Sequence, residues 1–163
     1  MMNVRIIHLT GDDFAALAAG DRTTAGTENL SEWLAGPECR SVWRRRHAQF
    51  EQDPATAAWV TGIIWDDDAR VAVGRAGYHG PPDEDGMVEI GYAVDPAYRR
   101  RGYARAALEA LLARARNEPA VRRVRVSISP DNVASHNLAA QYGFVKVGEQ
   151  WDDEDGLEYV YEI

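Results

Sequence analysis

The stretch from Val88 to Arg116 reads VEIGYAVDPAYRRRGYARAALEALLARAR, and it contains the signals on which the fold depends. Its first seven residues alternate between two faces, as in a β-strand. The larger apolar side chains share one face: Val88, Ile90, Tyr92 and Val94. Glu89 and two small residues, Gly91 and Ala93, share the other face. Asp95-Pro96 then ends the strand, because proline lacks the N–H group that a strand ladder needs.

A helix is predicted after the basic turn Arg99–Gly102, because apolar residues recur there with the i, i+3, i+4 spacing of one buried stripe. The residues of this stripe are Ala104, Ala107, Leu108, Leu111, Leu112 and Ala115. The first N–H groups of a helix have no partner in the chain, and the helix dipole adds positive charge at that end. Gly102 lets an anion approach the backbone, and the arginines can pair with phosphate. The stretch therefore predicts a phosphate-binding site.

Two segments carry a resemblance to a known family. Arg99-x-x-Gly102-x-Ala104 resembles the Q/R-x-x-G-x-G/A signature of the GCN5-related N-acetyltransferases, the GNAT superfamily. Downstream, Asp131-Asn132-Val133-Ala134-Ser135, closing with Tyr142-Gly143-Phe144, is similar to the N-x-x-S…G-F segment of the same superfamily, in its RimJ/RimL-type branch of ribosomal-protein N-acetyltransferases. The alternative is a generic phosphate-binding strand–helix unit. The G-x-x-x-x-G-K-[ST] and G-x-G-x-x-G motifs of other phosphate sites do not occur.

The resemblance implies acetyl-coenzyme A as co-substrate and no metal. It implies that the helix N-terminus holds the pyrophosphate and that the backbone of Ala93 and Val94 meets the pantetheine arm. The cofactor-binding residues it implies are Tyr92, Ala93, Val94, Arg99, Arg100, Arg101, Gly102, Tyr103, Ala104, Arg105, Asn132 and Ser135.

The whole chain has the composition of one globular domain, which we expect to span residues 1–163. Hydrophobic residues make up 45% and charged residues 27% of its 163 residues. Its apolar runs are too short to cross a membrane, and its first residues show no secretory signal. Cys39 is the only cysteine, so no internal disulfide can form. A reducing cytoplasm is therefore the expected location, and a buried or neutral thiol fits Cys39 better than a nucleophile does.

The formal net charge is −8, with a pI near 5.0. This charge argues against nucleic acid as the main ligand, because phosphate binding requires a basic surface. It suits a cationic amine as substrate, and solubility alone is an equal alternative. The second arginine cluster, Arg44–Arg46, is expected to be a solvated helix face rather than a site. The oligomeric state stays open, with a homodimer as one alternative.

Taken in order, the chain predicts the elements β-α-α-β-β-β-α-β-α-β-β. Strands are expected near residues 4–9, 56–65, 70–79, 88–94, 121–128, 144–151 and 157–163. Thr10 is expected to cap the first helix, and a glycine-containing polar stretch, 20–27, follows it. One or two helices, broken near Gly36-Pro37, are expected within residues 30–53. The fold class is therefore α/β (α+β), a mixed central sheet of about seven strands flanked by about four helices, and the same order is found in the acetyltransferase family.

Glu89 is the candidate general base. An amine must lose a proton before it can attack a thioester, and Glu89 lies just before the cofactor turn on a face whose other residues are small. The resemblance places a carboxylate in this region of many family members. The alternative is a partly exposed strand glutamate paired with an arginine.

The proton donor for the departing thiolate is less clear from the sequence. The tyrosine that many members of the family place seven residues after the asparagine is replaced here by Ala139. Ser135 is preferred, because its spacing from Asn132 matches the RimJ/RimL pattern; a serine in the first turn of a helix is its structural alternative. Tyr142 is the second candidate, with core packing as its alternative.

Other polar and aromatic residues give weaker signals. The four histidines, His8, His47, His79 and His136, show no metal spacing, and structural or surface roles are expected for them. Trp33 and Trp43 fall in the early helical region, where they line an acceptor site or belong to the core.

Two function classes follow. The first is an acetyl-coenzyme A-dependent N-acetyltransferase that acts on a primary amine, either a protein N-terminus or a small amine. The second is a non-catalytic domain that binds an acyl-coenzyme A as a sensor or within an assembly. Glu89 and the basic turn favour the first class, and the missing tyrosine at position 139 favours the second.

Overall fold

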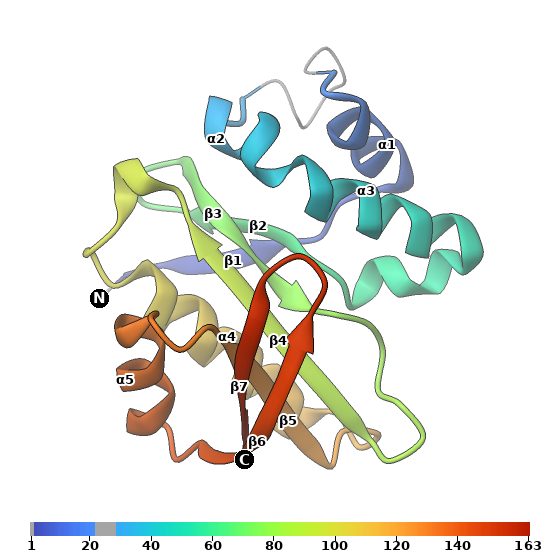
Figure 1. The fold of residues 1–163 in the computed structure, drawn as a ribbon. Helices are drawn as coiled ribbons and strands as arrows, with labels where there is room; N and C mark the ends of the chain where they lie inside the picture. Colours follow the sequence, from blue (N-terminus) through green and yellow to red (C-terminus); the bar gives the residue numbers. More distant parts are fainter. Residues whose placement is uncertain (1, 22–28) are drawn as a thin grey trace.

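A computed structural model describes residues 2–21 and 29–163 and arranges them around a seven-stranded mixed sheet (Figure 1). The strands are β1 (Val4–Ile7), β2 (Gly62–Asp66), β3 (Val71–Tyr78), β4 (Met87–Val94), β5 (Arg123–Ile128), β6 (Val145–Asp152) and β7 (Gly156–Glu162). Their order across the sheet is β1-β2-β3-β4-β5-β7-β6. Only the β4–β5 pair is parallel among these strands. The predicted fold class is confirmed, and most of the polar stretch 20–27 lies outside the described residues.

In the described part of the chain, five α-helices cover the two faces of the sheet: α1 (Gly11–Ala19), α2 (Glu32–Ala35), α3 (Pro37–Gln52), α4 (Tyr103–Asn117) and α5 (Val133–Gln141). Helices α1 to α3 pack on one face of the sheet, over its β2–β3 end. Helices α4 and α5 lie together on the opposite face (Figure 1). The predicted cap of α1 is present, because the Thr10 hydroxyl accepts from the Asp13 N–H group at 3.2 Å. Residues 30–53 form two helices, since Gly36 ends α2 and Pro37 occupies the first turn of α3.

The predicted stripe of α4 packs against β4, as the sequence indicates. The inward side chains of the strand, Val88, Ile90 and Val94, are at most 9% exposed. Those of the helix, Ala107, Leu108, Leu111, Leu112 and Ala115, are at most 4% exposed and belong to the same cluster. Burial of each large aliphatic side chain stabilises the fold by about 1.5–3 kcal/mol. The strand, the turn and the helix are therefore held as one unit, with the other face of β4 left for a site.

The strand expected over residues 56–65 is wrong in its first half. Residues Pro54–Ala58 form a short 3₁₀ helix, and β2 begins only at Gly62. The Asp53 carboxylate accepts from the Ala55 N–H group at 3.1 Å, and proline fixes the first residue of the turn. Trp59 follows this helix and packs on Tyr78 with ring centroids 5.7 Å apart. A local cap and a proline thus outweigh the alternating pattern.

The outer strand β6 carries several exposed apolar side chains, among them Val145, Val147 and Trp151. No residue within 2–21 and 29–163 covers them. Association of the chain into a homodimer stays a prediction. No helix within residues 2–21 and 29–163 has the length and apolar character needed to span a membrane. That residues 1–163 form one domain also stays a prediction.

Candidate active site

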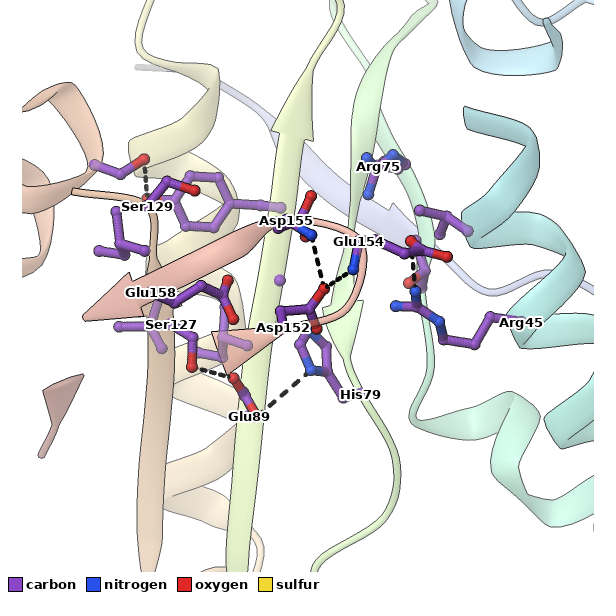
Figure 2. Close-up of a pocket in the computed structure, with 18 of the residues that line it drawn as sticks. Arg45, Arg75, His79, Glu89, Ser127, Ser129, Asp152, Glu154, Asp155 and Glu158 are labelled. Atoms are coloured by element: carbon purple, nitrogen blue, oxygen red, sulfur yellow. Dashed lines mark hydrogen bonds and ion pairs between the residues drawn. The ribbon is translucent and has the colours of Figure 1, made fainter. Parts of the chain in front are cut away.

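A cavity of about 430 Å³ lies on the sheet face that carries Glu89 (Figure 2). Its walls come from α3, from β3 to β5, from the start of α5 and from the β6–β7 hairpin. Six acidic side chains line it: Glu38, Glu89, Asp152, Glu154, Asp155 and Glu158. Three arginines line it as well: Arg45, Arg46 and Arg75. The volume is that of a site for a small ligand.

The strands β4 and β5 pair over only half of β4. Their parallel register runs from Met87 to Ile90 on β4, and Ile90 pairs with Val126. Beyond this point β4 pairs with β3, while β5 pairs with β7. A gap therefore opens between two neighbouring strands, beside Tyr92 and Ser135 of the cavity wall.

Backbone groups of β4 point into this gap. The Glu89 carbonyl accepts from the His79 N–H group at 2.8 Å, and the Asp95 N–H group donates to the Val73 carbonyl at 2.8 Å. The odd-numbered residues of β4 therefore direct their backbone N–H and carbonyl groups toward β3. In an antiparallel ladder the direction alternates, so Tyr92 and Val94 direct theirs toward the gap. An extended ligand can pair with these groups as an added strand would.

Glu89 is held by two partners, and neither is an arginine. The Ser127 hydroxyl on β5 donates to Glu89 Oε1 at 2.5 Å, and His79 Nδ1 lies 3.5 Å from Glu89 Oε2 (Figure 2). Burial raises the pKa of Glu89, but the hydrogen bond and charge of His79, the Ser127 hydroxyl and the charge of Arg125 together lower it below its usual value of 4.5. Glu89 is therefore a carboxylate at neutral pH. Arg125 itself is paired with Glu162 at 2.7 Å.

His79 is a cavity residue that the sequence analysis missed. It was expected to have a structural or surface role, but it lines the cavity and faces Glu89 across the β3–β4 hairpin. Its Nε2 lies over Gly91, where a Cβ atom would come within 2.8 Å of that nitrogen. Gly91 therefore leaves room for the ring. The sequence placed residues 79 and 89 on two neighbouring predicted strands, but only the hairpin register, in which the His79 N–H group donates to the Glu89 carbonyl, sets them opposite each other.

Three residues meet where the gap joins the cavity: Tyr92, Asn132 and Ser135. The Asn132 side chain caps α5 by accepting from the Ser135 N–H group at 3.2 Å. The Tyr92 hydroxyl donates to Ser135 Oγ at 3.3 Å. Burial raises the pKa of Tyr92, although the bond to Ser135 acts in the opposite direction. Tyr92 thus keeps its proton at neutral pH and has a proton that it can donate, whereas the sequence placed it only among the cofactor contacts.

Tyr142, the second donor candidate from the sequence, does not line the cavity. Its hydroxyl donates to Glu109 of α4 and accepts from Arg105 Nη1 at 3.0 Å. These contacts tie the end of α5 to α4. The role of Ser135 stays a prediction, and Tyr142 has a structural role that accounts for it.

The turn before α4 exposes the backbone that the phosphate-site prediction requires. Gly102 occupies the cap position with φ +90°, a left-handed conformation that favours glycine. Among the described residues, no side chain caps the helix, and a Cβ atom at Gly102 would meet only Met2 Cε, at 3.8 Å. The first N–H groups of α4 therefore face open space.

The side chains of this turn have unequal freedom. Arg99 Nε donates to the Val94 carbonyl at 3.0 Å, and Arg101 lies over the Tyr98 ring. Tyr103 is 7% exposed, and its hydroxyl donates to Asp66 at 2.6 Å. Its side chain is thus used inside the fold, which leaves its N–H group for an anion.

The expectation that Arg44–Arg46 form a solvated helix face is wrong for Arg46. Arg44 is exposed and Arg45 pairs with Glu154 at 2.7 Å, but Arg46 is only 4% exposed. It follows Cys39 and Trp43 on the stripe of α3 that faces the sheet, so its position is an inward one. Trp43, which is fully buried, belongs to the core.

Trp33 is half-buried, and Arg75 lies 5.9 Å above its ring centroid. Among residues 2–21 and 29–163, no group of three or more His, Cys, Asp or Glu side chains is placed to hold a metal ion.

Known structures share this fold. A ribosomal-protein-S5-alanine acetyltransferase from Vibrio fischeri superposes with a TM-score of 0.63 at 20% identity, covering 98% of this chain and 91% of that one. RimL, a ribosomal L7/L12 α-N-protein acetyltransferase in complex with coenzyme A, superposes with a TM-score of 0.67 at 16% identity, covering 100% of this chain and 94% of that one. The fold is the one these acetyltransferases have in common.

Sequence comparison defines the family. A family model described as an acetyltransferase (GNAT) domain matches residues 3–145. The uncharacterized N-acetyltransferase YjdG of Bacillus subtilis is 34% identical over 120 residues, which are 74% of this chain and 71% of that protein. The chain belongs to the GNAT family of N-acetyltransferases, as its two motif segments indicated.

Proposed function

We propose that this protein transfers the acetyl group of acetyl-coenzyme A to a primary amine, either a small amine or a protein N-terminus. The observation that carries the proposal is the cavity itself. It joins the gap between β4 and β5, where a thioester can enter, to the paired Glu89 and His79, which can accept a proton.

Acetyl-coenzyme A would bind along the turn and the gap. The free N–H groups that begin at Tyr103, together with the Arg99–Arg101 side chains, supply donors and charge for the pyrophosphate. The backbone of Tyr92 and Val94 would pair with the amides of the pantetheine arm, which places the thioester beside Ser135. The coenzyme A complex of RimL, a structure with the same fold, supports this donor.

The chemistry then uses groups on both sides of the thioester. Glu89 holds the His79 ring, whose Nε2 faces Gly91 and takes the proton of the incoming ammonium, directly or through water. The neutral nitrogen forms a bond to the acetyl carbon, and a backbone N–H group of β4 stabilises the oxyanion. The carbon–sulfur bond breaks next, and the Tyr92 hydroxyl, relayed by Ser135, protonates the departing thiolate. The nitrogen, which gained a positive charge when it attacked, loses its second proton as the amide forms, and this proton returns to Tyr92 through water.

The second candidate function, a non-catalytic acyl-coenzyme A-binding domain, is separated by one assay. Release of free thiol from acetyl-coenzyme A is measured with a panel of small amines and of peptides with free N-termini, and coenzyme A binding is measured by calorimetry on the same protein. We expect amine-dependent thiol release. Tight coenzyme A binding without release for any acceptor would favour the sensor instead.

A further inference from the structure

Two arginines in the cavity wall have no acidic partner. Within the described ranges 2–21 and 29–163, no ion pair up to 4.0 Å involves Arg46 or Arg75. Arg45, which also lines the cavity, does have one in Glu154. The difference matters because buried charges are normally paired.

Arg46 is buried against neutral groups. Its Nε donates to Thr61 Oγ1 at 2.9 Å and its Nη1 donates to Gln49 Oε1 at 2.8 Å, which leaves donors of its five N–H groups available. Burial, together with the charges of Arg45 and Arg75, lowers the pKa of Arg46 to about 10, although Glu89 acts in the opposite direction. Burying this charged guanidinium therefore costs free energy, and an anion bound beside it would offset that cost.

Arg75 lies at the same wall, next to the place of reaction. It pairs with Ala93 in the β3–β4 register, so the two side chains share the cavity face of the sheet. Within residues 2–21 and 29–163, its buried Nε has no hydrogen-bond partner. Its near neighbours are the Trp33 ring and the thiol of Cys39. Burial raises the pKa of this thiol, although the hydrogen bond and the charge of Arg75 act in the opposite direction.

Arg46 of α3 and Arg75 of β3 line the same cavity. Thr61, which holds Arg46, lies against Gly77, and Gly77 is two residues from Arg75 on the same face. The charge of Arg75 acts on Arg46 accordingly. Two like charges at one wall, one of them buried, form a receptor for an anion that sits between or beside them.

We propose that the amine acceptor carries a carboxylate and that Arg46 and Arg75 bind it. This proposal rests on the proposed function and names the class of its substrate, an amino acid or another amine with an acidic group. The acceptor would lie across the cavity, its carboxylate at the α3 wall and its ammonium toward the carboxylates of the β6–β7 hairpin and Glu89. A single negative charge suits the site better than a phosphate dianion, because six carboxylic side chains line the same cavity.

The test compares two acceptor series of increasing length: ω-amino acids and the n-alkylamines that lack the carboxylate. The thiol-release rate gives kcat/KM for each. We expect at least one amino acid to exceed its matched alkylamine by roughly 10- to 100-fold, the usual worth of a charge-assisted hydrogen-bond pair. Arg75→Gln should remove this preference mainly through KM, so that kcat/KM for the amino acid falls to about that of its matched alkylamine. Arg46→Gln should do the same, and Arg46→Lys, which keeps the charge if the glutamine variant does not fold, should retain part of the preference.

Arg44→Gln is the matched control, because Arg44 is an exposed arginine of the same helix that does not line the cavity. Equal rates for the two series, or a preference that survives in Arg75→Gln, would overturn the proposal. So would a stronger preference for aminoalkyl phosphates, which are tested as a third series.

The proposed function and the carboxylate site can fail separately. If no amine releases thiol, the transfer reaction is refuted. The site is then tested by calorimetry with the longest ω-amino acid and its alkylamine, both titrated into the protein saturated with coenzyme A. Binding of the amino acid alone, lost in Arg75→Gln and kept in Arg44→Gln, would support the carboxylate site, and equal or absent binding of the two would overturn it.

Discussion

The cofactor turn and the acceptor cavity are built in opposite ways. The turn is seven consecutive residues, Arg99–Arg105, and its binding groups are mainly backbone N–H groups at the start of α4. The cavity takes its side chains from α3, three strands of the sheet (β3 to β5), the start of α5 and the β6–β7 hairpin, which are far apart in the sequence. A backbone site requires one local conformation, whereas a side-chain site requires several registers at once. On the proposed function, the turn holds the coenzyme and the cavity selects the acceptor.

The largest effect should come from the Glu89–His79 pair, which lies in the cavity and is separate from the turn. Glu89→Gln keeps the shape and the Ser127 contact but removes the charge that holds His79. We expect kcat to fall by roughly 10²–10⁴-fold, the usual worth of a positioned acid–base group, with coenzyme A affinity unchanged. Steady-state rates and calorimetry measure the two quantities. His79→Gln should lower the rate to a similar extent, and a wild-type rate in both variants would show that the pair is structural.

The turn should respond in the opposite manner. Gly102→Val forces a branched side chain into φ +90° and places it over the free N–H groups. We expect coenzyme A affinity to fall by roughly 10- to 100-fold, since one or more charge-assisted hydrogen bonds are lost.

A suitable control for Gly102→Val is Gly148→Val, where a Cβ atom meets no atom of the described residues within 4 Å. Both variants should remain folded by circular dichroism. Unchanged binding in the Gly102 variant would remove the turn from the cofactor site, and the contrast between the two regions would then fail.

The same contrast explains what the sequence could and could not predict. The strand, the turn and α4 follow from local patterns, so their bounds were predicted closely. Arg46 was misjudged because a charged residue was assumed to face solvent, whereas the stripe that contains Trp43 turns it inward. His79 was missed because its importance lies in facing Glu89 across a hairpin, which no local pattern shows. The strand expected from residue 56 begins later, because Asp53 caps a short 3₁₀ helix that starts at Pro54. This cause is also local, but the alternating pattern was given more weight than the cap and the proline.

A smaller effect should come from the residues where the two regions meet. Tyr92→Phe and Ser135→Ala each interrupt the path of the proton to the thiolate. We expect kcat to fall by roughly 10-fold, which is less than the usual 10²–10⁴-fold of a positioned proton donor, because a thiolate leaves easily. Tyr142→Phe should have no effect on the rate, since its hydroxyl contacts only α4. A poor, high-pKa amine should be used, because breakdown of the intermediate then limits the rate. Equal wild-type rates for Tyr92→Phe and Ser135→Ala would mean that solvent supplies the proton.

The smallest effect is a dependence of stability on pH that should distinguish two glutamates of the cavity. The pKa of Glu89 is lowered in the folded protein, so its charge stabilises the fold above pH 4.5 and this contribution is lost as the pH falls through the lowered value. The pKa of Glu158 is raised, first by burial and also by the charges of Asp152, Asp155 and Glu89, against a hydrogen bond from Gln150. Its protonated form stabilises the fold below pH 4.5, and that contribution is lost as the pH rises through the raised value.

Glu89→Gln should therefore reduce the stability measured by urea unfolding at neutral pH, and the loss should diminish at acid pH. Glu158→Gln should change stability in the opposite direction, with a gain at neutral pH that disappears at acid pH. If both variants change the free energy of unfolding in the same direction, the hairpin carboxylates do not repel one another. Their proposed role in attracting the ammonium end of an acceptor then loses its electrostatic basis.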